Sequence, residues 1–144
     1  MPMKKFNFQL EDVLSIRNFQ QEQAEIELGK ALNEEQKISD KLQMIALQHA
    51  ECVKSMEGSV DFSAIISAQQ FFAMLEEQKN FLLEELAKAK IVTEQKRKIL
   101  QEHMKKTASL QKLREKELES YNSEKLLEEE TFIDDIVTSR YRKS

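Results

Sequence analysis

The sequence predicts an all-α protein in which two long helices fold back on each other as an antiparallel coiled-coil hairpin. Residues that interrupt helices are scarce, with 2 glycines and 1 proline among 144 residues. Apolar side chains recur in alternating strides of four and three residues, which is the repeat of a left-handed coiled coil. Glu57–Asp61 has the composition of a turn and separates two uninterrupted helical stretches.

The first helix is expected over residues 7 to about 57. Positions on its stride are mostly apolar, ten of the fourteen, and they are Leu10, Leu14, Arg17, Gln21, Ala24, Leu28, Ala31, Glu35, Ile38, Leu42, Ile45, His49, Cys52 and Met56. A helix on a globular core would follow a period of 3.6 and drift off this stride. The first helix should therefore bury one narrow stripe, which we call the seam, against a partner helix. Gly29 weakens the helix by about 1 kcal/mol relative to alanine without ending it.

The turn is expected at about residues 58–61, and the second helix at about 62–142. Gly58 can take the left-handed conformation that ends a helix, and Asp61 or Ser63 can cap the next one. The seam of the second helix begins with Ile65, Ala68, Phe72, Leu75, Lys79, Leu82, Leu86 and Ala89. Apolar residues after Ala89, such as Ile99 and Leu113, leave this stride. The seam is therefore expected to slip in the second half of the helix.

The second helix should be longer than its partner. A single short turn makes the helices antiparallel neighbours, so the stretch after about residue 114 is expected to overhang without a partner in the chain. Because isolated helices are only marginally stable in water, this stretch should fray, kink or bind a partner. Ile133, Ile136 and Val137 lie on one face and suggest a docking stripe; a disordered tail is the alternative.

Composition excludes several classes of function. The net charge of −4 shows no basic excess, so nucleic acid is not an expected partner. Hydrophobic residues make up 40% and both charge signs are mixed, which favours a folded chain over a disordered one. Cys52 is the single cysteine and fits a reducing compartment. No run of 18 apolar residues occurs, so no insertion into a membrane is expected.

No constellation of residues suggests catalysis, a metal or a cofactor. His49 and His103 lie far apart and have no zinc-ligand spacing with Cys52. Two glycines cannot form a phosphate-binding glycine motif. The protein is therefore expected not to be an enzyme.

Aromatic residues just after the turn suggest a contact surface. Phe71 and Phe72 are adjacent and point about 100° apart on a helix, so at least one should be exposed. Exposed aromatic patches often mark protein contacts. Alternatively, Phe71 packs sideways where Met44, Ile45 and Leu47 widen the core.

Two segments resemble a known family. The N-terminus places Phe6, Phe8 and Leu10 at every second position, followed by Val13-Leu14 and by Ile16-Arg17. With Gln69-Gln70-Phe71 and Leu75-Glu76 after the turn, this pattern resembles the flagellar export protein FliJ family over nearly the whole chain.

The resemblance implies a fold similar to the central stalk of rotary ATPases and a role in flagellar type III protein export. It implies a non-catalytic stalk that binds the export ATPase hexamer, the membrane export gate and export chaperones. Such a protein would be cytoplasmic, held at the inner face of the cell membrane through the export apparatus. The resemblance implies gate or chaperone contacts at Ile45, Gln48, Phe71 and Leu75. It implies ATPase contacts at the open end of the hairpin, at Leu10, Val13, Leu14, Arg17, Leu110, Leu113 and Arg114. A virulence-type secretion stalk and a generic dimerising coiled coil remain alternatives.

Overall fold

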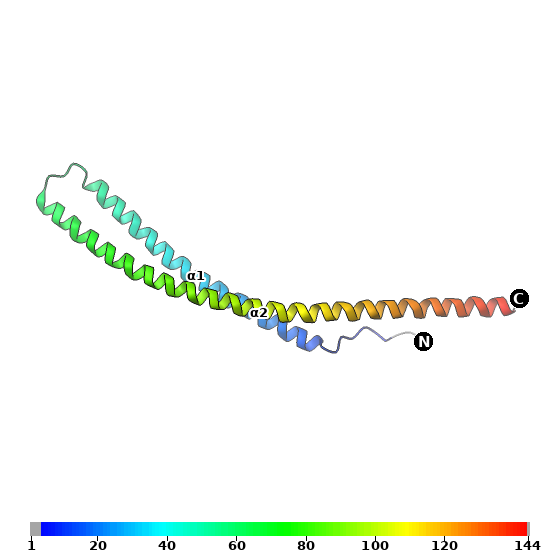
Figure 1. Ribbon diagram of the computed structural model, residues 1–144. Helices are drawn as coiled ribbons and strands as arrows, with labels where there is room; N and C mark the ends of the chain where they lie inside the picture. Colours follow the sequence, from blue (N-terminus) through cyan, green and yellow to red (C-terminus); the bar gives the residue numbers. More distant parts are fainter. Residues whose placement is uncertain (1–3, 144) are drawn as a thin grey trace. The chain divides into compact units, whose positions relative to one another are not determined.

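The computed structural model describes residues 4–143, which form two helices and, within that range, no strand. α1 is Glu11–Ser55, 45 residues, and α2 is Phe62–Lys143, 82 residues. The two helices pack against each other as a hairpin (Figure 1), which confirms the predicted fold class. The chain divides into two compact units. We call residues 23–101 the turn unit, and residues 1–22 together with 102–144 the terminal unit.

The helix ends follow local hydrogen bonding. α1 begins at Glu11 rather than near residue 7, because the Glu11 amide donates to the Phe8 carbonyl over 3.0 Å and residues 4–8 are not helical. Glu11 and Asp12 place acidic charge in the first turn of α1, where the helix dipole favours it. After α1, Gly58 has a φ of 74°. Oδ1 of Asp61 then accepts a 3.0 Å hydrogen bond from the Ser63 amide, so Asp61 caps α2.

In the turn unit, the two helix segments run antiparallel with a core one seam wide. The rings of His49 and Phe72 lie 4.5 Å apart near the turn, and Glu27 and Lys96 pair over 4.0 Å farther from it. The buried side chains of this unit are Ala24, Ala31, Ile45, Ala68, Leu75 and Thr93. Half of them are alanines, so the seam has little apolar volume. Every residue of the predicted α1 stride in this unit is buried or half-buried, except the exposed His49.

The expected slip of the α2 seam after Ala89 is wrong. The least exposed side chains keep the alternating stride as far as Arg114, through Thr93, Lys96, Leu100, His103, Thr107 and Leu110. Ile99 and Leu113, which suggested the slip, are instead 45% and 40% exposed beside the seam. The prediction failed because it followed only apolar residues, whereas much of this seam is polar. After Arg114 the stride changes to Leu118 and Tyr121, a local irregularity that unwinds a supercoil.

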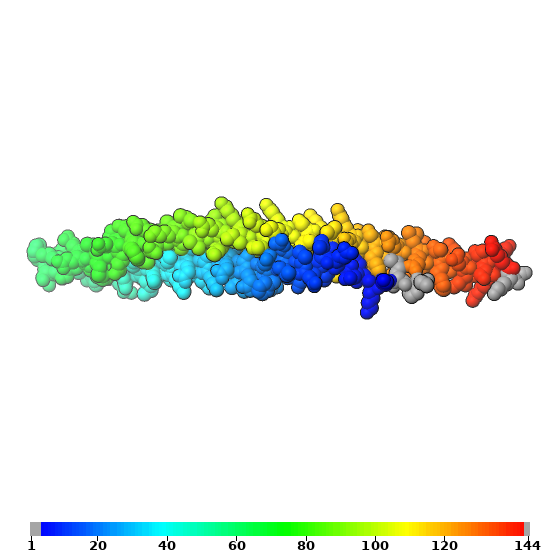
Figure 2. Space-filling model, turned by 90° about the horizontal axis from the view of Figure 1, so that it is seen from below, coloured from blue at the N-terminus to red at the C-terminus, as the bar shows by residue number. Residues whose placement is uncertain are grey.

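In the terminal unit, α2 has partners beyond the point at which the overhang was expected to begin. Thr107 Oγ1 donates to the Arg17 carbonyl over 3.4 Å, and Arg114 Nε donates to Oε2 of Glu11 over 2.9 Å. Residues 4–8 then continue along α2 as far as Tyr121, whose hydroxyl donates to the Lys4 carbonyl. Figure 2 shows the dark blue start of the chain beside the yellow-to-orange part of α2. α2 stays helical to Lys143, and its side chains from Glu129 to Arg142 are exposed.

Candidate partner-binding surfaces

Three kinds of feature bear first on function in the described residues: a metal site, unpaired buried polar groups and a membrane-spanning helix. In the part of the chain that the structure describes, no group of three or more His, Cys, Asp or Glu residues could hold a metal ion. Nδ1 of His103 is buried in the terminal unit without a hydrogen-bond partner. No helix within residues 4–143 is long and apolar enough to cross a lipid bilayer.

The four predicted gate or chaperone residues divide between core and surface. Leu75 is 2% exposed and Ile45 is 8% exposed, so both belong to the core of the turn unit. Leu75 occupies the seam, as its stride predicts, so it is not available for the partner contact that the resemblance implies there. Phe71 and Phe72 are both half-buried, so the prediction that at least one would be exposed is wrong. Gln48 is exposed.

Two exposed residues beside Phe71 were not singled out as contact residues. Met74 is 45% exposed and Phe81 is 61% exposed. With Lys41 of α1 and Gln78, they line a shallow groove in the turn unit. Phe71, Met74 and Phe81 each precede a seam residue by one position, so they form a second stripe about 100° around α2 from the seam. The sequence contains this offset, because each of the three residues stands directly before a residue of the seam stride.

A second groove of the turn unit follows the opposite edge of the seam. Its lining includes His49 of α1 and Phe72, Ala73 and Leu83 of α2. Ala73 and Leu83 each follow a seam residue by one position. The turn unit therefore presents one groove along each edge of the α2 seam, and the tilted His49–Phe72 ring pair belongs to the second.

The seven predicted ATPase-contact residues lie together in the terminal unit. Leu14 is buried, and Arg17, Leu110 and Arg114 are half-buried. These four occupy seam positions. The other three predicted residues are exposed to a similar extent, with values of 37% for Leu10, 39% for Val13 and 40% for Leu113. The seam residues hold the helix segments together, and the three exposed residues offer the most apolar surface to a partner.

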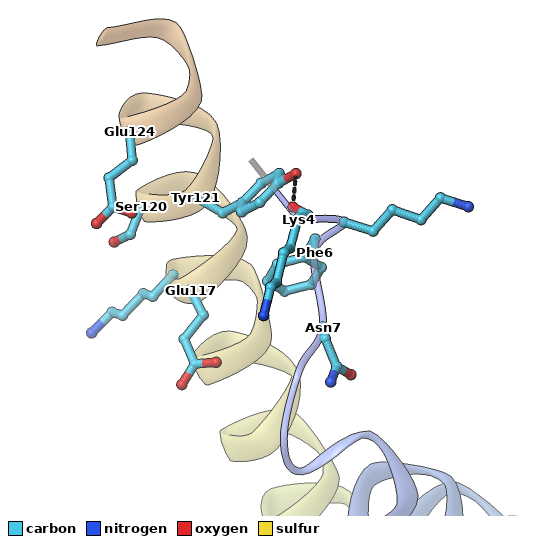
Figure 3. A pocket seen from close by; sticks show the side chains of 9 residues that line it. Lys4, Phe6, Asn7, Glu117, Ser120, Tyr121 and Glu124 are labelled. Carbon is cyan, nitrogen blue, oxygen red and sulfur yellow. Dashed lines mark hydrogen bonds between the residues drawn. The ribbon is translucent and has the colours of Figure 1, made fainter. Parts of the chain in front are cut away.

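An N-terminal strap, residues 4–8, is a feature that the sequence did not predict as a contact (Figure 3). The ring of Phe6 lies 5.6 Å from that of Tyr121 at 56°, and the Arg114 guanidinium lies 5.5 Å from the centre of the Phe6 ring. The Tyr121 hydroxyl donates a 2.6 Å hydrogen bond to the Lys4 carbonyl, drawn dashed in Figure 3. Phe8 is 3% exposed. Beside the strap, an open groove is lined by Lys4, Phe6 and Tyr121 among others.

The contacts that hold the strap and the cost of ordering it are comparable in free energy. Burying Phe8 stabilises the docked strap by about 1.5–3 kcal/mol. The aromatic pair adds about 1 kcal/mol, and the cation–π contact of the half-buried Arg114 adds about 0.5–1 kcal/mol. The hydrogen bond from Tyr121 contributes about 1 kcal/mol. Ordering the backbone of the strap costs about 1–2 kcal/mol for each residue. Because the gains and the cost are of the same size, the strap should open easily.

A comparison with protein families decides where the chain belongs. The model described as "Flagellar FliJ protein" matches residues 6–144, essentially the whole chain. The chain belongs to the FliJ family. No curated protein and no solved structure gives a match. The resemblance seen in the sequence is thereby confirmed, and membership supports a role related to flagellar protein export in a family of structural proteins rather than known enzymes.

The FliJ match includes both ends of the terminal unit. It begins at Phe6, the strap residue that contacts Tyr121 and Arg114. It also includes the predicted docking stripe, in which Ile133 is 57%, Ile136 38% and Val137 60% exposed. The strap from Phe6 onward and the docking stripe therefore lie within the region that the family model describes.

Proposed function

We propose that this FliJ chain is a non-catalytic stalk and adaptor of the flagellar type III protein export apparatus. The observation that carries the proposal is the family match over residues 6–144 on a hairpin with a core one seam wide. The side chains of such a core hold the two helices together, and the side chains outside it are available for contacts with partners. The protein would work at the inner face of the cell membrane, held there by the apparatus.

In this proposal the terminal unit binds the ring of the export ATPase. Leu10, Val13 and Leu113 support it, because they form an exposed apolar border beside a buried seam. Arg17 and Arg114 add positive charge at the same end, although Arg114 is paired with Glu11. Leu14 and Leu110 would act indirectly, by fixing the distance between the helix segments that carry this border.

The turn unit would bind the export gate and the export chaperones. The stripe of Phe71, Met74 and Phe81 supports this, since Phe and Met are enriched at protein interfaces. Gln48 of α1 would contribute a polar contact. Ile45 and Leu75 would hold the surface in place from the seam rather than touch the partner.

The test is whether the chain binds and stimulates the flagellar export ATPase of its own organism. We expect the full chain to raise ATP turnover by the ATPase and to be recovered with it in a pull-down. Leu113→Glu should abolish both effects, whereas Ile99→Glu, at a residue of similar exposure in the turn unit, should preserve them. Absence of binding and of stimulation by the unsubstituted chain would refute the proposal. A dimer in sedimentation, with no effect on the ATPase, would instead favour a generic scaffold.

A further inference from the structure

The strap lies on a face of α2 that has the chemistry of a peptide-binding site. Arg114, Leu118 and Tyr121 follow one another at strides of four and three residues, so they share one face of α2. Arg114 supplies a guanidinium over an aromatic ring, and Tyr121 supplies both a ring surface and a hydroxyl donor. All three side chains are half-buried with the strap in place.

The strap contacts this face in the way that a separate ligand would. Residues 4–8 have no helix or strand of their own, and they contact Tyr121 through one main-chain carbonyl and one ring. Neither contact depends on the chain continuing into α1. The third group, the Glu11 carboxylate on Arg114 Nε, is a charge that any nearby acidic residue could supply.

We propose that the Arg114–Tyr121 face of α2 is a binding site for an extended peptide segment that carries an aromatic residue. The strap occupies this site in the free protein. A partner's segment with the same chemistry takes the site when the strap lifts: a ring for Arg114 and Tyr121, and a main-chain carbonyl for the Tyr121 hydroxyl. The strap thus acts as an autoinhibitory ligand, and the site goes beyond the apolar border to which the ATPase contact was assigned.

The experiment uses the full chain labelled with 3-fluorotyrosine and a peptide of the chain's own residues 4–11. Fluorine NMR gives a signal for Tyr121, assigned by its loss in Tyr121→Phe. Phe6→Ala should shift this signal, because it removes the ring 5.6 Å away. Phe19→Ala is the matched control, since Phe19 is 60% exposed in the same unit, and it should leave the signal in place.

The peptide then tests the site in trans. Added up to millimolar concentration, it should move the Tyr121 signal of the Phe6→Ala chain back toward its original position and saturate. It should have at least a tenfold weaker effect on the unsubstituted chain, where the strap is present. A peptide with its own Phe6→Ala change should have no effect. The proposal fails if the peptide leaves the Phe6→Ala chain unchanged or acts equally on both chains. Because no ATPase is present, either failure leaves the proposed stalk function standing.

Discussion

Arg114 Nε donates a 2.9 Å hydrogen bond to Oε2 of Glu11, joining α2 to the first residue of α1. The same guanidinium lies over the ring of Phe6. One side chain therefore fixes both where α1 begins and where the strap lies. Three segments of the terminal unit meet at this arginine.

Arg114→Lys should loosen the terminal unit. Lysine keeps the charge but lacks the planar guanidinium that stacks on a ring while donating from its edge. We expect a loss of about 0.5–1 kcal/mol in the free energy of unfolding, measured by urea denaturation. Arg97→Lys is the control, because Arg97 makes only an exposed pair with Glu94 one turn away. Equal losses in the two variants would contradict this role of Arg114.

Leu75→Ala should destabilise the turn unit strongly. Leu75 is the most deeply buried large side chain among the described residues, and removing such a side chain from a core costs about 2–5 kcal/mol. Thermal unfolding followed by circular dichroism should show a clear drop in Tm. Phe81→Ala removes a larger side chain that is 61% exposed, so its Tm should change little. A larger drop in Tm for Phe81→Ala than for Leu75→Ala would mean that Phe81 belongs to the core.

The two glycines should respond to alanine in opposite directions. An added Cβ meets no atom within 4 Å at either Gly29 or Gly58, so steric clashes decide neither case. Gly29→Ala should stabilise by about 1 kcal/mol, because it lies inside α1. Gly58→Ala should destabilise by about 1–2 kcal/mol, because φ is positive there. Urea denaturation of the two variants beside the unsubstituted chain would give the sign of each change in the free energy of unfolding. A stabilising Gly58→Ala would argue against the turn geometry.

Phe71→Ala should weaken binding to the export gate or chaperones more than it weakens the fold. Phe71 is only half-buried and its ring lies 6.5 Å from that of Phe72, so helicity should remain nearly intact. Binding to immobilised gate or chaperone should fall by about tenfold or more, the effect of losing an interface anchor of about 1.4 kcal/mol. Melting of the turn unit, seen by circular dichroism, would instead identify Phe71 as a core residue.

Much of the fold was readable because both helices repeat one simple pattern. Two helices and one turn could be predicted from three features: the scarcity of residues that interrupt helices, the alternating spacing of apolar residues by four and three positions, and Gly58. The seam of α2 beyond Ala89 was not readable from apolar residues alone. Thr93 lies in it because its hydroxyl donates to the Ala89 carbonyl of the same helix, which lets a polar side chain enter a narrow core.

The candidate surfaces were harder to predict, since burial depends on which edge of a helix faces its partner. The resemblance implied a partner contact at Leu75, whereas its stride predicted the seam, and the structure buries it there. Phe6 and Phe8 were informative as a family signature, yet nothing local indicated that they would reach Tyr121. A contact between residues more than a hundred positions apart follows from the register of the hairpin, which the sequence pattern does not specify at its open end.

A core that is one seam wide affects how the length of such a protein can evolve. Each layer in the turn unit meets only the layers before and after it, so seven residues could be gained or lost in both helix segments without disturbing the remaining layers. The spacing between the Phe71 stripe and the ends of the unit would then change in discrete steps of about 10 Å.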